Sequence, residues 1–277
     1  MTDTETPQGA TCILFALPEE RKPFLAGLRL AGAQLLTNSP FAEQEAGTHP
    51  DYRLIALEFC GRKIITAVSR VGEKNASKLM ATLAEAGGID ALMICGFAGG
   101  LSAEMAAGDL ILSDSVARSS ASHIRCFPDA SLLDAAESLS TDECGKTLKM
   151  RTHLGLLVTA AAVLTSQKEK LSLAESTGGF AVDMETFSAV QTAQAHWIPW
   201  LAIRAITDPS NSALPLDFNK LADSKGNISY ARVMLSLVIR PRKIPALIRL
   251  GRNSSLAAKN LSQFLIALLR RLPEIEE

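Results

Sequence analysis

The chain has 277 residues, of which 47% are hydrophobic and 5% aromatic, and its formal net charge is −1 at pH 7. This length supports a large buried core, and the balanced charge and scarce aromatic residues argue against a nucleic-acid-binding protein. The five cysteines form no CxxC pair and the four histidines no HxxxH spacing, so we expect reduced thiols in the cytoplasm, no metal and no organic cofactor.

The first ten residues, MTDTETPQGA, are polar and acidic rather than basic and apolar. They are predicted to be a disordered tail and not a signal peptide. No later apolar run reaches the length of a membrane-spanning helix.

Seven apolar runs after this tail have the length and composition of buried strands. They are, in chain order, 11–17, 54–60, 63–69, 91–97, 109–116, 154–160 and 200–206. The second and third runs are separated only by Gly61 and Arg62, which predicts a tight hairpin and therefore some antiparallel pairing.

Helical patterns separate several of these runs. The clearest are 73–88, which ends in two glycines, and 184–197, which Pro199 follows closely. Strands that alternate with helices predict one three-layer α/β/α domain with a central mixed sheet, which we assign to residues 11–240.

The C-terminal region has a different character. From Ser224 to Pro273 it has ten basic residues and no acid, spaced among apolar residues. We expect 241–277 to be a basic amphipathic helical extension. It could cover the domain or meet acids of a neighbouring subunit, lie on anionic lipid through 240–272, or bind a partner protein.

Acids and glycines directly follow three predicted strands. Glu19 and Glu20 follow the first strand, Gly96 belongs to the glycine-rich ICGFAGGL, and Asp208 precedes Pro209 after the last strand. Each could be structural, as a helix start or a turn. Ligands of α/β proteins gather at the carboxyl ends of strands, however, so these positions are also favourable for a site.

Asp183 and Glu185 flank Met184 in an apolar run. A helix that began near Asp183 would place the two carboxylates about 200° apart, so they could not face one reacting atom. They could complement the helix dipole. Alternatively, one could accept hydrogen bonds from the vicinal hydroxyls of a ligand such as ribose, with Met184 packed against its apolar face.

Four segments in this order resemble the nucleoside phosphorylase/nucleosidase superfamily, especially its methylthioadenosine/S-adenosylhomocysteine nucleosidase-like branch. They are ALPEE (16–20), GFAGGLSAEMAAGDLILSDS (96–115), AVDMET (181–186) and RAITDPSN (204–211), and the similarity spans about residues 11–240. A narrower likeness, which includes RPRKIPALIRLGRNSSLAAKNL (240–261), is to the hopanoid biosynthesis-associated phosphorylases.

The resemblance implies catalytic roles for the acids. Asp208 would donate a proton to purine N7, and Glu20 would position or deprotonate the attacking water, with Glu19 as the register alternative. Glu185 would hold the ribose 2′- and 3′-hydroxyls. Asp183 stands where nucleosidases usually have glutamate, and it would support the loop or the hydroxyl contacts.

The resemblance also implies a lining for the pocket. Met184 would pack on the sugar. Gly96, Phe97 and Ala98 would lie along the base and ribose. Backbone groups of Val163 and Leu164 would meet adenine.

The nucleophile is water or phosphate. Ile94 and Phe97 stand where phosphorylases of the hexameric bacterial type have an arginine and a serine, and neither side chain can bind an anion. Arg21, Arg70 and Arg204 are possible substitutes, although an arginine inside a buried strand usually pairs with a carboxylate. The sequence therefore favours hydrolysis, and phosphate stays open as a co-substrate.

The expected partner is a small-molecule nucleoside whose 5′ substituent is open, with a lipid-bearing nucleoside as one candidate. The resemblance implies a homodimer or a higher homo-oligomer. Two non-catalytic alternatives remain: a nucleoside-binding protein without turnover, and a membrane-peripheral scaffold that acts through its basic extension.

Overall fold

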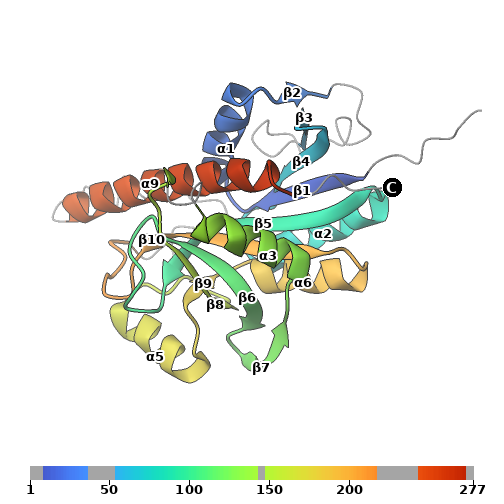
Figure 1. The fold of residues 1–277 in the computed structure, drawn as a ribbon. Coiled ribbons are helices and arrows are strands. Elements are labelled where there is room, and N and C mark those ends of the chain that lie inside the picture. Colours follow the sequence, from blue (N-terminus) through green and yellow to red (C-terminus); the bar gives the residue numbers. More distant parts are fainter. Residues whose placement is uncertain (1–8, 37–53, 143–146, 217–242, 273–277) are drawn as a thin grey trace, which may run out of the picture.

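The computed structural model describes residues 9–36, 54–142, 147–216 and 243–272 (Figure 1). Residues 1–8 of the expected tail lie outside this range, as do four basic residues of the C-terminal region: Lys225, Arg232, Arg240 and Arg242. Within the described residues, no helix has the length and apolar character needed to cross a membrane.

One mixed sheet forms the centre of the fold. Its strands are β1 (Ala10–Phe15), β2 (Gln34–Leu35), β3 (Ile55–Phe59), β4 (Arg62–Val68), β5 (Ile89–Gly100), β6 (Leu110–Arg118), β7 (Ala121–Cys126), β8 (Thr152–Thr159), β9 (Ala181–Asp183) and β10 (Trp200–Asp208). The helices are α1 (Pro18–Leu30), α2 (Glu73–Ala86), α3 (Ala130–Thr141), α5 (Gln167–Thr177), α6 (Thr186–Ala195) and α9 (Ile244–Leu269). All seven predicted strands and the mixed character of the sheet are confirmed.

The predicted hairpin is confirmed, with its turn one residue earlier than expected. Phe59 pairs with Arg62, so the turn residues are Cys60 and Gly61. Both have positive φ, 52° and 69°, as a two-residue hairpin turn requires. Three strands were not predicted, β2, β7 and β9, because two- and three-residue strands and an exposed strand give no apolar run.

Helices cover both faces of the sheet. Alternate residues of the central strands point to opposite sides, so Cys12 and Ile94 pack with α2 and α6, whereas Ile13 and Cys95 pack with α1, α3 and α9. Figure 1 shows α1 and α9 together on one side of the sheet. This is the predicted three-layer arrangement.

Five strands close into a ring. β5 pairs with β10 and β9, β10 also pairs with β6, and β8 joins β6 to β9. At Gly99 of β5, the neighbours are Asp208 on one side and Val182 on the other. The ring therefore brings the ends of β9 and β10 to the same end of β5.

The two halves of α9 differ in burial. Leu261, Phe264 and Leu265 in the second half are buried in the core that α1 also contacts, and Ser262 donates a hydrogen bond to the carbonyl of Pro23 (3.2 Å). In the first half, Ile248 is 52% exposed. The described part of the expected extension is thus a helix whose second half belongs to the core, while the boundary at residue 240 stays a prediction.

Candidate active site

The candidate site lies at the carboxyl end of β5, over the stretch 96–99. β1 and β10 run parallel to β5 on its two sides, so the residues that follow these strands meet there. Glu20 comes from the start of α1 after β1, and Asp208 is the last residue of β10. Asp183 ends β9, and Glu185 follows two residues later.

Glu20 is held by backbone donors on the first turn of α1. Pro18 opens this helix, and the Glu20 carboxylate accepts hydrogen bonds from the N–H groups of Ala16 and Leu17, both at 2.9 Å. Its other oxygen accepts from the N–H of Phe97 at 2.8 Å. Glu20 is 2% exposed. Burial raises its pKa, and Arg204 and the three N–H donors oppose the rise.

Glu19, the register alternative to Glu20, is exposed on the outer side of α1. Only Glu20 of this pair reaches β5. Neighbouring residues at a helix start point in directions about 100° apart, so the strand-to-helix turn alone separates their environments.

The expected helix start near Asp183 is wrong. Asp183 is the last residue of β9, and α6 begins at Thr186 with Glu185 as its N-cap residue. The helical angle of 200° therefore does not apply. Both carboxylates reach the same nitrogen of Arg204: Nη2 is 2.6 Å from Asp183 Oδ2 and 3.8 Å from Glu185 Oε2.

Arg204 lies at the centre of this cluster and is 1% exposed. Its Nε and Nη2 atoms donate to Thr186 Oγ1 at 3.2 and 2.7 Å. Asp183 also accepts hydrogen bonds from the hydroxyls of Thr159 (2.7 Å) and Thr186. The expectation that Arg204 pairs with a carboxylate is confirmed.

The remaining terminal nitrogen of Arg204, Nη1, is buried and has no hydrogen-bond partner. It lies against Gly96, where a Cβ would be 2.4 Å from Nη1 and 2.8 Å from Glu20 Oε1. A side chain at position 96 would therefore occupy the space where the guanidinium and the Glu20 carboxylate approach the strand.

Glu185 is buried, and it accepts a hydrogen bond from the N–H of Gly72 at 2.8 Å. Burial and the charge of Asp183 raise its pKa to about 7, against the lowering effects of Arg204 and the Gly72 N–H. Met184 is partly exposed beside it. A carboxyl of this kind changes its charge near neutral pH.

Asp208 is 8% exposed, and both of its carboxyl oxygens have partners. Oδ2 accepts from Lys170 Nζ at 2.6 Å, and Oδ1 accepts from the hydroxyl of Thr207 at 2.7 Å. Burial raises the pKa of Asp208, and the Lys170 ammonium and the Thr207 hydroxyl oppose the rise. A Cβ on Gly99 would be 3.2 Å from Oδ2, so this glycine leaves room for the carboxyl group.

The other residues predicted to line the pocket lie in β5 and in the segment that precedes α5. Ala98 is buried in β5, and its carbonyl is 3.4 Å from the Thr207 hydroxyl. Leu164 packs against Leu101 and Val182. Val163 is partly buried just before it, and the chain after Asp208 returns to this segment through a hydrogen bond from Leu214 N to Thr165 O (2.9 Å).

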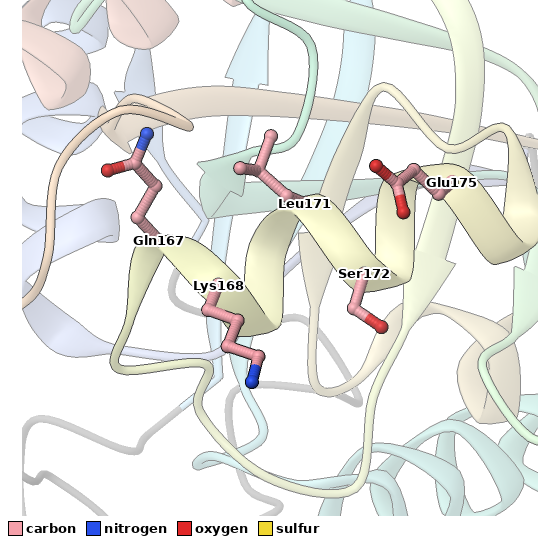
Figure 2. A pocket seen from close by; sticks show the side chains of 5 residues that line it. All are labelled: Gln167, Lys168, Leu171, Ser172 and Glu175. Carbon is pink, nitrogen blue, oxygen red and sulfur yellow. The ribbon is translucent and has the colours of Figure 1, made fainter.

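Sequence reasoning missed Lys170 and Thr186. Lys170 occurs in QKEK beside Lys168, and nothing local separates a buried lysine from an exposed one. The outer face of α5 carries a surface hollow lined by Gln167, Lys168, Leu171, Ser172 and Glu175 (Figure 2). The hollow is separate from the candidate site, because none of the site residues described above lines it. Lys170, on the same helix, is buried and contacts Asp208 instead.

The chain is similar in sequence and in fold to known proteins. A family model described as the Phosphorylase superfamily matches residues 11–238. The 5′-methylthioadenosine/S-adenosylhomocysteine nucleosidase of Mycobacterium bovis is 26% identical over 207 residues, which are 64% of this chain and 81% of the relative. The aminodeoxyfutalosine nucleosidase of Campylobacter jejuni is 22% identical over 190 residues, 65% of this chain and 83% of the relative.

A solved structure of similar fold is the futalosine hydrolase of Helicobacter pylori, with a TM-score of 0.70 and 16% identity over 96% of this chain and 99% of that one. Another is a 5′-methylthioadenosine/S-adenosylhomocysteine nucleosidase structure from Neisseria meningitidis, with a TM-score of 0.69 and 16% identity over 95% and 100% of the two chains. At these identities the likeness establishes the fold, a mixed α/β sheet of the nucleoside phosphorylase type.

Gly96→Ala tests the packing of the cluster. The new methyl group would meet Arg204 Nη1 and Glu20 Oε1 at less than 3 Å, so we expect a loss of about 1–3 kcal/mol in the free energy of unfolding. Gly251→Ala is the matched control, because nothing lies within 4 Å of its Cβ position in α9. That change should stabilise the chain by about 0.5–1 kcal/mol. Urea unfolding measures both, and equal effects would contradict the packing.

Glu185→Gln tests the raised pKa of Glu185. The folded chain holds a proton on Glu185 where the unfolded chain has lost it, between the ordinary value of 4.5 and about 7. The contribution of Glu185 to stability therefore falls as pH rises through this window, and the variant lacks this loss. We expect the variant to gain roughly 1–3 kcal/mol relative to wild type between about pH 5 and about pH 8, since a tenfold change in proton affinity is about 1.4 kcal/mol.

Urea unfolding at the two pH values measures this difference. Glu58→Gln, at an exposed position of β3, is the control and should give no pH-dependent gain. A gain of the same size in both variants would assign the effect to net charge instead of to the buried cluster.

Proposed function

The chain belongs to the Phosphorylase superfamily, and from that premise we propose that it cleaves the N-glycosidic bond of a purine nucleoside with water as the nucleophile. The relatives described above are nucleosidases by name, which supports an enzyme of this class. The observation that carries the proposal is the convergence of Glu20 and Asp208, from two distant segments, on the stretch 96–99 of β5, where Arg204 lies against Gly96 and pairs with Glu185.

Each of these acids has a separate role in the proposed reaction. A protonated Asp208 donates its proton to purine N7, so that the electrons of the breaking C–N bond pass to a neutral leaving base. The sugar then carries oxocarbenium-like positive charge, and the Glu185 carboxylate holds its 2′- and 3′-hydroxyls beside Met184. Water adds to C1′ and loses a proton to Glu20. Asp183 fixes Arg204 and Thr186, and so keeps Glu185 in place.

The charge of the cluster supports water over phosphate. Three carboxylates, of Glu20, Asp183 and Glu185, lie around the single guanidinium of Arg204, and the side chains of Ile94 and Phe97 offer no donor to an anion. A phosphate dianion would compete with Asp183 for the guanidinium of Arg204 in a buried site, which is unfavourable. A water molecule could instead accept a hydrogen bond from Arg204 Nη1, which has no hydrogen-bond partner, and donate one to Glu20. Both groups lie against Gly96.

Phosphorolysis is the alternative reaction. Arg21 and Arg70 are the other arginines that could hold phosphate there. A non-catalytic nucleoside-binding protein is the alternative of another class. The presence of both a buried acid and a buried base candidate, Asp208 and Glu20, supports turnover over binding alone.

Adenine is the proposed base, with backbone groups of Val163 and Leu164 at its edge and Gly96, Phe97 and Ala98 along its face. The proposed nucleoside carries a 5′ substituent. A hydrophobic lipid, as in an adenosylhopane-type nucleoside of hopanoid biosynthesis, is the finer candidate, and the narrower sequence likeness supports it. The homo-oligomer stays a prediction.

Asp208→Asn tests the proposed acid. An amide cannot donate the proton to N7, so release of free adenine from adenosine or 5′-methylthioadenosine should fall about 10²–10⁴-fold. Asp134→Asn, at an exposed position of α3, is the matched control and should keep wild-type activity. The assay measures free base by chromatography.

The same assay with and without inorganic phosphate separates the two reactions. Release that does not depend on phosphate supports hydrolysis, and release that requires phosphate would overturn it. Full activity of Asp208→Asn would remove Asp208 from the mechanism. Wild-type protein that binds adenine but releases none would favour the binding protein.

Contact with a membrane is proposed through the first half of α9. Ile248 and Leu256 are 52% and 44% exposed there, and Arg249 and Arg252 are exposed beside them. Apolar and basic residues on one helix face are typical of interfacial binding. This arrangement would let the enzyme meet a lipid-bearing nucleoside at the bilayer surface.

Arg249→Glu/Arg252→Glu tests this contact. Each basic residue near an anionic surface contributes about 1 kcal/mol, so the double change should reduce affinity for phosphatidylserine-containing vesicles about tenfold or more. Lys74→Glu/Lys78→Glu, on the exposed face of α2, is the control with the same charge change. Co-sedimentation measures both, and absence of wild-type binding would contradict the membrane contact.

A further inference from the structure

A buried lysine holds the proposed acid. The side chain of Lys170 is 0% exposed, and its Nζ contacts four oxygens of the segment that begins at Asp208. They are Asp208 Oδ2 at 2.6 Å, Asp208 O at 3.1 Å, Pro209 O at 3.0 Å and Ser212 O at 3.2 Å. An ammonium has three N–H donors, so this set saturates it.

Helix stability does not explain this lysine. Ser166 and Glu169 form the capping box of α5, which fixes the helix start and places Lys170 in its first turn. A cation in the first turn is opposed by the positive end of the helix dipole, and burial of a lysine is costly without a partner. The position is therefore explained by what Lys170 contacts across the ring of strands.

We propose that Lys170 is the positioning residue for leaving-group protonation: it holds Oδ2 of Asp208, leaves Oδ1 to carry the transferred proton, and stabilises the carboxylate that remains. This inference rests on the proposed function, because it assigns a partner to the acid of that reaction. Nothing in the sequence motifs points to residue 170.

The two oxygens of Asp208 are distinguished by their partners. Lys170 keeps its protons in the step, so Oδ2 stays a hydrogen-bond acceptor throughout. The hydroxyl of Thr207 donates to Oδ1 at 2.7 Å but also lies 3.4 Å from the carbonyl of Ala98. When the hydroxyl turns to that carbonyl, Oδ1 can hold a proton, which passes to N7 as the C–N bond breaks.

The other charged side chains near Asp208 are paired with partners of their own. Among the described residues, Lys170 is the charged side chain that contacts this carboxyl. β5 presents Gly99 to it, α9 reaches the neighbouring carbonyl of Thr207 through the neutral Asn253, and Arg204 on the same strand pairs with Asp183. Asp109 on β6 pairs with Arg151 and His153.

The charge of Lys170 should determine the pH above which the enzyme loses activity. The reaction needs a protonated Asp208, so the alkaline limb of kcat/KM against pH reports the pKa of this acid in the free enzyme. The Lys170 ammonium lowers that pKa. A neutral residue at position 170 should therefore move the alkaline limb to higher pH, whereas a purely structural defect would lower activity without moving it.

The experiment compares Lys170→Met and Lys170→Gln, which remove the charge, with Lys170→Arg, which keeps it. Adenine release from 5′-methylthioadenosine is measured across the neutral pH range. We expect kcat near neutral pH to fall about tenfold to a hundredfold in both neutral variants, as misplacement of a catalytic group does, with little change in KM. Their alkaline limbs should move to higher pH, and the limb of Lys170→Arg should stay near that of wild type.

Lys168→Met is the matched control, because Lys168 lies on the outer face of the same helix (Figure 2). It should leave both kcat and the pH profile unchanged. Unmoved limbs in the two neutral variants, or neutral variants that do not fold by circular dichroism, would assign Lys170 to stability and overturn the proposal.

A second readout does not depend on activity. Titration of the Asp208 carboxyl by ¹³C NMR, assigned with Asp208→Asn, should give a higher pKa in Lys170→Met than in wild type. If wild-type protein releases no base, the proposed function fails, and this titration still decides whether Lys170 controls the acid. An unchanged titration would overturn the inference even if the enzyme is active.

Discussion

The ion cluster around Arg204 is the constraint on which the site depends. Its guanidinium is buried, so each carboxylate that it contacts must stay in place to offset the cost of its desolvation. Asp183 makes the short contact and Glu185 the longer one, which fixes the end of β9 and the start of α6 relative to β10. The same residue that stabilises the fold therefore sets the position of the proposed sugar-binding carboxylate.

The ring of five strands explains why such a cluster can form. β5 has neighbours on both sides over its last residues, and small residues there let side chains from the flanking strands approach its backbone. Gly96 accommodates Arg204 and Glu20, and Gly99 accommodates Asp208. The glycine-rich segment thus gives space to three charged groups, a role distinct from that of phosphate-binding loops.

The two ends of the site differ in electrostatics. At the Arg204 end, three acids lie around one cation, and burial together with the charge of Asp183 raises the pKa of Glu185. At the other end, Asp208 has Lys170 as its own cation, held by the backbone carbonyls of 208–212. Separate partners allow two buried acids to hold different charges, as a reaction with one proton donor and one carboxylate requires.

The sequence by itself determined seven of the ten described strands, the mixed sheet and the family, because apolar runs, a two-residue turn and the DMET and RAITD motifs are local signals. It also selected Glu20, Asp183, Glu185, Arg204 and Asp208, but not how they meet. The helix geometry assumed for Asp183 and Glu185 was wrong, since whether a strand or a helix holds Asp183 depends on pairing with β5 and β8. Lys170 looks like any surface lysine in the sequence, and only the packing of α5 against the end of β10 turns it inward. Local propensity cannot encode that choice, because it arises from a contact between residues 38 positions apart.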